Sequence, residues 1–193
     1  MIFNPDIHHR RSIRLQGYDY SKNGAYFVTL STKDRNCYFD QFEQLRSIVE
    51  LQWQSIPERF PDVMVDEYVI MPNHVHGIIV IGGDAPCGYP EHGVTDFSQQ
   101  GRNSPKGGPT LGVIVGAFKS LCANAWLRTI KTDNLDAIGK FWQSNYYEHI
   151  IRNAEEMGRI RQYIADNPLK WEQDRENPMV SKDQEGQTEQ WMW

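Results

Sequence analysis

Two histidines stand one residue apart inside the apolar stretch VIMPNHVHGIIVI, residues 69–81. On a β-strand, side chains two residues apart project from the same face at a spacing of about 7 Å. The neutral imidazoles of His74 and His76 could therefore share one divalent cation, with a further ligand from elsewhere. The alternative is a pair of structural histidines at a strand end, and the pattern alone favours neither interpretation.

A second candidate group lies on the helix expected over residues 153–168 (NAEEMGRIRQYIADNP), which Pro168 ends. Tyr163 and Asn167 are neighbours at i and i+4, and both fall at the edge of the apolar stripe of this helix. From this edge the phenol of Tyr163 could reach the histidine pair and still meet a substrate. The alternative is a tyrosine at the core boundary and an asparagine that only ends the helix.

The periodicity of apolar side chains predicts the elements that must position these residues. Strands are expected over 25–33, 62–71 and 74–81 and within 140–153, and helices over 42–56, 110–126 and 153–168. The order strand–helix–strand–strand–helix–strand–helix predicts the split βαβ plan of a ferredoxin-like α+β sandwich. We therefore expect one antiparallel sheet with helices packed on it.

Composition divides the chain into three parts. We expect a basic N-terminal arm over residues 1–24, one domain over 25–171 and a polar acidic tail over 172–193. Within the domain, residues 82–109 form a long loop insertion rich in Gly, Pro and polar side chains.

The composition also bears on the compartment and on charge. No apolar run approaches the length of about 20 residues that a membrane span needs, and the N-terminal residues lack the apolar segment of a signal peptide. The three cysteines are scattered, which indicates reduced thiols in a cytoplasmic protein. The net charge is −5, yet residues 1–35 carry six basic and three acidic groups, and residues 102–170 carry ten and six. Basic surfaces therefore remain available for phosphates.

The two motifs together resemble one known family. PNHVH within an apolar strand, followed by a helix with YIADNP, is similar to the single-tyrosine HUH transposases, and most of all to the REP-associated tyrosine transposases. The resemblance covers most of the chain, since AYFVTLSTKDRNCYF, LGVIVGAFKSLCANAW and FWQSNYYEHIIRNAEEMGRIRQYIADNPLKW also fit the pattern of the family. It implies that residues 25–171 are an HUH tyrosine transposase domain.

The resemblance also implies roles for individual residues. His74 and His76 match the metal-binding histidines, and Tyr163 matches the nucleophile. Asn167 occupies the place where relatives carry a glutamine that completes the metal site, so its shorter side chain leaves the third ligand open. Tyr146 and Tyr147 rank second as nucleophiles, because we expect them on a strand or turn. The implied reaction nicks and rejoins single-stranded DNA through a 5′-phosphotyrosine, with Mg²⁺ or Mn²⁺ as the cofactor.

The implied partner is single-stranded DNA with hairpins, and the implied assembly is a monomer or a homodimer in the bacterial cytoplasm, at the nucleoid when DNA is bound. The basic side chains that could contact DNA lie on the N-terminal arm and in the second half of the chain: Arg10, Arg11, Arg14, Lys119, Arg152, Arg159, Arg161 and Lys170.

Two other functions are compatible with the same residues. One is a metal-dependent phosphodiesterase in which water replaces the tyrosine as nucleophile. The other is a hairpin-binding protein derived from a transposase that no longer cleaves DNA.

Overall fold

A four-stranded antiparallel sheet forms the centre of the computed structural model, which describes residues 19–20, 22–82, 108–174 and 177–180. The strands are β1 (Gly24–Ser31), β2 (Val63–Ile70), β3 (His74–Ile81) and β4 (Tyr147–Ile151), in the spatial order β2-β3-β1-β4. The helices are α1 (Tyr38–Gln41), α2 (Glu43–Gln54), α3 (Ile56–Arg59), α4 (Leu111–Asp133) and α5 (Ala154–Asp166). Two 3₁₀ turns, η1 (Lys33–Arg35) and η2 (Asn167–Gln173), follow β1 and α5.

This topology confirms the predicted split βαβ plan. The chain from β1 through α1, α2 and α3 enters β2 with β3 lying between the two strands, and the chain from β3 through α4 enters β4 with β1 between them. All three neighbouring strand pairs are antiparallel.

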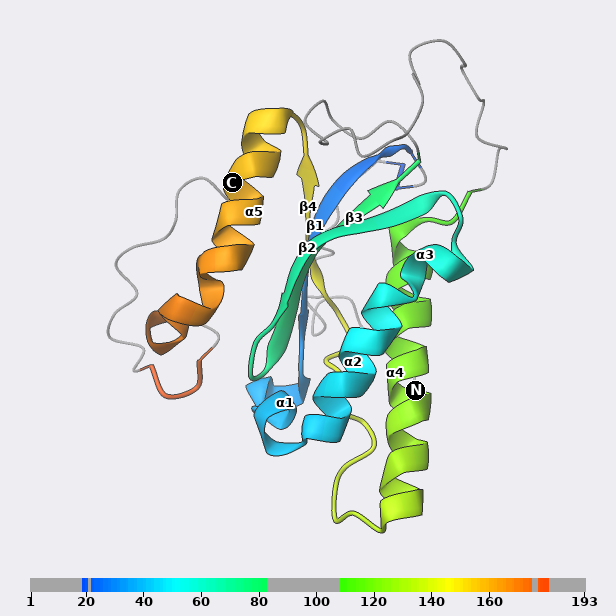
Figure 1. Cartoon of the computed structure of the whole chain (residues 1–193), viewed down its shortest axis with the longest axis vertical. Helices are drawn as coiled ribbons and strands as arrows, with labels where there is room; N and C mark the ends of the chain where they lie inside the picture. Colours follow the sequence, from blue (N-terminus) through cyan, green and yellow to red (C-terminus); the bar gives the residue numbers. More distant parts are fainter. Residues whose placement is uncertain (1–18, 21, 83–107, 175–176, 181–193) are drawn as a thin grey trace, which may run out of the picture.

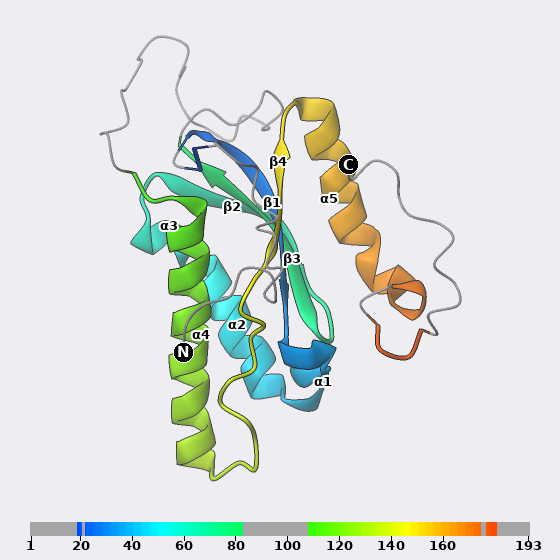
Figure 2. The same cartoon turned by 180° about the vertical axis from the view of Figure 1, so that it is seen from behind.

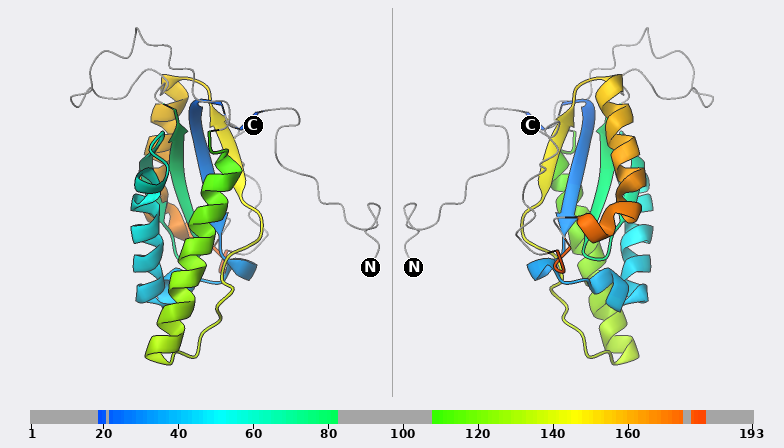
Figure 3. Two further views of the ribbon diagram at one scale, coloured as in Figure 1. Left: turned by 90° about the vertical axis from the view of Figure 1, so that its right-hand side faces the viewer. Right: turned by 90° about the vertical axis from the view of Figure 1, so that its left-hand side faces the viewer.

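The helices cover both faces of the sheet (Figures 1 and 2). Helices α2 and α4 pack on one face, over a large core that includes Tyr26, Val28 and Leu30 of β1. Helix α5 packs on the opposite face, over a smaller cluster that includes Ala25 and Phe27. The two side views in Figure 3 show one covered face each. Because both faces are covered, every residue of β3 is buried.

The elements differ from the sequence-based expectations mainly at their ends. The helix expected over 42–56 ends at Gln54, and a short helix then begins at Ile56, because a proline in a first helical turn loses no hydrogen bond. The strand expected within 140–153 forms only over Tyr147–Ile151. Before it, an isolated bridge joins Trp142 to Thr32, just after β1, and Gln143 donates its N–H to the carbonyl of Ser31 at 3.0 Å.

Parts of the predicted organisation lie outside the described residues. These are most of the N-terminal arm, residues 83–107 of the long loop, and residues 175–176 and 181–193 of the tail. In the described part of the chain, Cys37 and Cys122 carry free thiols, and none of the helices combines the length and apolar character needed for a bilayer crossing.

Gly77 is expected to be essential for stability, because a β-carbon there would overlap the ring of buried Trp53. We predict that Gly77→Ala lowers the free energy of unfolding by about 1–3 kcal/mol or more, as overpacking of a core does. Urea denaturation measures the change. In the control variant Gly116→Ala, the added carbon meets nothing within 4 Å on helix α4. Stability there should stay equal or rise by up to about 1 kcal/mol; equal losses in both variants would contradict the packing argument.

Candidate metal centre

His74 and His76 occupy the first and third positions of β3, opposite Ser31 and Thr29 of β1. Their alternation with Val75 turns both imidazoles to the face that α5 covers. The rings are buried, with 0% and 4% exposure, and their centroids lie 4.4 Å apart. The predicted spacing therefore does bring the two rings together.

The preceding residue, Asn73, determines which nitrogen of His74 carries the proton. The side-chain amide nitrogen of Asn73 donates to the carbonyl of Arg35 at 2.9 Å, so its oxygen faces Nδ1 of His74 at 2.8 Å. An amide oxygen only accepts, hence Nδ1 of a neutral His74 carries the hydrogen. Nε2 is then left with a lone pair that carries no proton, which is the state that a metal ligand needs.

Burial keeps this imidazole neutral. Burial first, and then the positive charge of Arg35, lowers the pKa of His74 to about 3. At neutral pH the ring therefore does not compete with a cation by binding a proton of its own.

One ring nitrogen of His76 contacts the hydroxyl of Thr29, which can either donate or accept a hydrogen bond. Nδ1 of His76 lies 2.9 Å from Oγ1 of Thr29, and its Nε2 lies 3.0 Å from Nε2 of His74. Without a cation, Nε2 of His76 can donate to His74 while Thr29 donates to Nδ1. With a cation between the rings, the proton belongs on Nδ1, and the hydroxyl turns to accept it.

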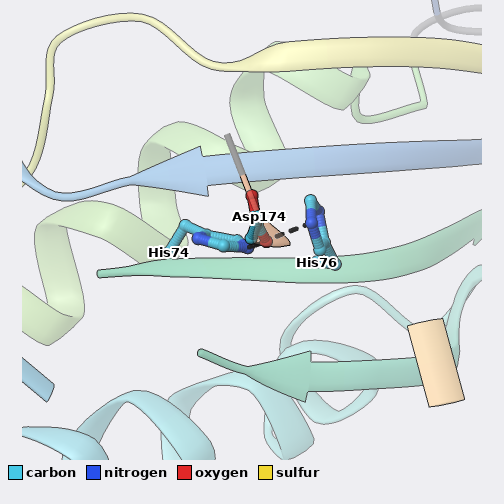
Figure 4. A group of neighbouring side chains, drawn as sticks. All are labelled: His74, His76 and Asp174. Carbon is cyan, nitrogen blue, oxygen red and sulfur yellow. Dashed lines mark hydrogen bonds and ion pairs between the residues drawn. The ribbon is translucent and has the colours of Figure 1, made fainter. Parts of the chain in front are cut away.

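Asp174 brings a carboxylate to the same point (Figure 4). Its Oδ2 lies 3.8 Å from Nε2 of His74, and the ligand atoms of His74, His76 and Asp174 all lie within 4.8 Å of one another. Sequence reasoning missed this residue, which follows η2 in the region assigned to the acidic tail. Asp174 lies in a polar segment without periodicity, three residues after Trp171, whose ring the structure places 6.1 Å from that of His74, so the sequence carried no signal for it.

This donor set fits a divalent metal ion. Two imidazole lone pairs and one carboxylate oxygen converge, and the electron-rich atoms repel one another unless a proton or a cation lies between them. The two imidazole nitrogens suit borderline ions such as Fe²⁺, Ni²⁺ and Zn²⁺, and the carboxylate oxygen suits hard ions such as Mg²⁺ and Mn²⁺.

Tyr163 reaches the centre from α5. Its hydroxyl lies 3.5 Å from Nε2 of His76, and the two ring centroids are 5.4 Å apart. The ring meets Phe27 edge-on at 6.0 Å, within the small core beneath α5. The structure therefore places the phenol beside the histidine pair.

An ion pair fixes the helix that carries this tyrosine. Arg161 donates from Nε and an Nη atom to the two carboxylate oxygens of Asp66, at 2.8 and 2.7 Å. Asp66 lies where the β2–β3 register is interrupted between Val65 and Tyr68, which adds one residue to β2. The guanidinium that was expected to contact DNA is thus matched by a carboxylate within the fold.

Three other predicted site residues, Asn167, Tyr146 and Tyr147, pack within the fold. Asn167 is buried at the junction of α5 and η2, and its role as a ligand remains a prediction. Tyr147 packs against Phe27 in the small core, and Tyr146 packs against the large one. Both tyrosines remain second-ranked candidates.

Of the remaining predicted DNA contacts, the arginines of the N-terminal arm lie outside the described residues. The half-buried ammonium of Lys119 donates to the carbonyls of Gln143 and Asn145 at 2.6 and 3.1 Å, and burial lowers its pKa to about 8. This lysine therefore braces the chain before β4.

Three more of these cations lie on the exposed side of the α5 region. Arg152 is exposed at the turn before α5. Arg159 pairs with Glu155 at 3.6 Å, and Lys170 pairs with Asp166 at 3.7 Å. Such exposed pairs are weak, so these side chains remain available to a phosphate.

Comparisons with known proteins give one strong similarity. A Haemophilus influenzae protein, described only as an uncharacterized protein, is 40% identical over 183 residues, which is 90% of this chain and 96% of that protein. Among solved structures, a REP-associated tyrosine transposase bound to a REP hairpin is 22% identical with a TM-score of 0.47, over 81% of this chain and 73% of that chain. No family model matches the sequence.

Asp174 should contribute directly to metal affinity. We predict that Asp174→Asn weakens Mn²⁺ binding by more than about tenfold, since even the loss of an outer-shell partner of a metal typically costs 10- to 100-fold. Isothermal titration calorimetry measures the affinity. The control, Asp136→Asn, removes an exposed carboxylate between α4 and β4 and should bind as the parent does. Equal affinity for the parent and Asp174→Asn would remove Asp174 from the site.

The Arg161–Asp66 pair should couple α5 to the sheet. In a double-mutant cycle of Arg161→Ala and Asp66→Ala, we expect a coupling energy of about 1–3 kcal/mol from urea denaturation, because the bonds are bidentate and largely buried. The matched cycle on the exposed pair Arg159–Glu155 should give about 0.5 kcal/mol or less. Similar values in both cycles would contradict the anchoring role.

Proposed function

The chain belongs to the same protein family as its Haemophilus influenzae relative, and we propose that this chain is a REP-associated tyrosine transposase of the HUH type. It would nick and rejoin single-stranded DNA at hairpin sequences through a covalent 5′-phosphotyrosine. The proposal combines the PNHVH and YIADNP motifs with the geometry around them.

One observation carries the proposal. A tyrosine hydroxyl lies 3.5 Å from an imidazole nitrogen that belongs to a convergent group of metal-ligand atoms. Tyr163 comes from α5 and His76 from β3, 87 residues earlier in the chain, so local structure does not explain their meeting. A phenol beside a cation site is the arrangement that attack on a phosphodiester by a tyrosine requires.

In the proposed reaction, the phenolic oxygen of Tyr163 attacks phosphorus. The new O–P bond joins tyrosine to the 5′ side of the DNA, the P–O3′ bond breaks, and the departing 3′ oxygen gains a proton while the phenol loses one. A divalent metal ion, held by His74, His76 and Asp174, would polarise the phosphate oxygens. Because the ester bond is exchanged and not hydrolysed, the 3′ hydroxyl of another strand can reverse the step and join the DNA.

The surrounding side chains prepare the tyrosine. Phe27 packs edge-on against the Tyr163 ring and stacks on His76 at 5.3 Å, so the two reactive side chains share one rigid neighbour. The anchored helix then limits the phenol to a small range of positions beside the phosphate. Mg²⁺ or Mn²⁺ remains the expected cofactor.

The two alternatives use the same residues in other ways. A phosphodiesterase would activate water at the metal ion and release its product without a protein–DNA bond. A binding protein would hold the hairpin without cutting it. The proximity of Tyr163 to His76 favours the transposase, because neither alternative needs a phenol at that place.

The deciding experiment incubates the protein with a labelled single-stranded hairpin oligonucleotide and Mn²⁺, followed by a denaturing gel. We predict a covalent adduct for the parent and its loss, by more than about 1,000-fold in rate, for Tyr163→Phe. EDTA should abolish the adduct and spare hairpin binding. Tyr147→Phe is the matched control and should retain the adduct.

Each other outcome identifies a different function. An adduct that survives in Tyr163→Phe but not in Tyr147→Phe would transfer the nucleophile to Tyr147. Cleavage without an adduct would identify the hydrolase, and hairpin binding with no cleavage in Mg²⁺ or Mn²⁺ would identify the binding protein.

A further inference from the structure

We propose that a basic pocket beside His74, lined by Lys33, Arg35 and Lys140, binds a phosphate of the single DNA strand next to the scissile one. The inference rests on the proposed function, since it names where the strand continues from the metal centre. None of these three residues was among the DNA contacts expected from the sequence.

The pocket has the charge and size for this ligand. Its volume is about 500 Å³, and its lining carries three cations and one anion, Asp34, which lies 3.9 Å from the ammonium of Lys33. The three basic side chains are exposed to solvent, and Trp142 supplies a fixed apolar wall. A hollow with an excess of positive charge and one aromatic wall favours a nucleotide phosphate with its sugar.

The backbone that forms the pocket is held in an unusual conformation. Asp34 and Arg35 have φ angles of 56° and 55°, so two consecutive residues other than glycine lie in the left-handed region. This region is unfavourable for most residues with a β-carbon, because that carbon approaches the following carbonyl oxygen; aspartate tolerates it better than arginine does, so the strain lies chiefly at Arg35. Local hydrogen bonds maintain the turn: Lys33 donates its N–H to the carbonyl of Phe141, and Thr32 donates its hydroxyl to the carbonyl of Asn36.

A glycine at position 35 would relieve much of this strain, so the arginine has to be explained. In the left-handed conformation, the turn places Lys33, Asp34 and Arg35 together on the rim of one pocket. Strained backbone of this kind concentrates at functional sites, where the surrounding structure fixes it. Phosphate binding is a role that accounts for a basic side chain in such a position.

The pocket and the metal centre share one structural connection. The carbonyl of Arg35 accepts from Asn73, whose oxygen accepts from Nδ1 of His74. In the backbone, Thr32 donates its N–H to the carbonyl of Asn73 at 2.8 Å. The turn that lines the pocket is thus in direct contact with the residue that precedes His74, and for this reason the proposal places the phosphate next to the scissile one there.

The test measures hairpin-oligonucleotide binding by fluorescence anisotropy in EDTA, where no cleavage occurs. We expect the variant Lys33→Gln/Lys140→Gln to bind an oligonucleotide with a single-stranded flank about tenfold or more weakly than the parent. The slope of log K against log salt should become shallower by about 0.7 for each phosphate that the variant no longer neutralises. Lys22→Gln, an exposed lysine before the opposite end of β1, is the control and should bind as the parent does.

Arg35→Gly separates binding from folding. Because glycine adopts the left-handed conformation freely, this variant should be as stable as the parent or more stable, yet bind the flanked hairpin more weakly. Unchanged affinity in both pocket variants would overturn the inference, even if the protein nicks DNA. Weaker binding in a protein that never cleaves would support the pocket and reject the nicking function.

Discussion

The hydrogen bond between Nδ1 of His74 and the side-chain oxygen of Asn73 orients the whole centre. Nδ1 has to donate, because an amide oxygen has no hydrogen, and Nε2 is thereby turned as a bare lone pair toward His76 and Asp174. The side chain of Asn73 is itself fixed by the carbonyl of Arg35. Arg35 ends a turn in which the backbone has positive φ angles. The position of the Arg35 carbonyl thus determines, through Asn73, which ring nitrogen of the buried His74 carries the proton.

The two unequal faces of the sheet explain why the centre lies where it does. The large core beneath α2 and α4 contains most of the buried apolar side chains, among them the aromatic rings of Trp53, Phe118 and Trp126. The face beneath α5 has a much smaller core, with Val69, Tyr147 and Tyr163 packed at its margin. At this margin the sheet carries the polar side chains of Thr29 and His76, and α5 carries Tyr163, so the reactive groups lie at the edge of the small core.

Alternation and helical periodicity were enough to predict the ferredoxin-like sheet, but they left open whether Tyr163 reaches the histidines or only lies at the core boundary, and the family resemblance selected the first. The structure brings the side chains of His74, His76 and Tyr163 together, and each lies on a regular element whose geometry fixes the direction of its side chain. They could not identify Asp174, which follows a 3₁₀ turn in a polar segment without periodicity. Nor could they assign Arg161 to Asp66, since that pairing depends on a one-residue irregularity in β2 that only three-dimensional register reveals.

The order of the ligands along the chain has a consequence for the opening of the centre. Both histidines lie on β3, inside the sheet, whereas the carboxylate of Asp174 comes from the chain that follows α5 and η2. The donor set is therefore complete only when this last segment is packed against the sheet. Local opening of the segment would remove one donor while the sheet and both cores stay folded.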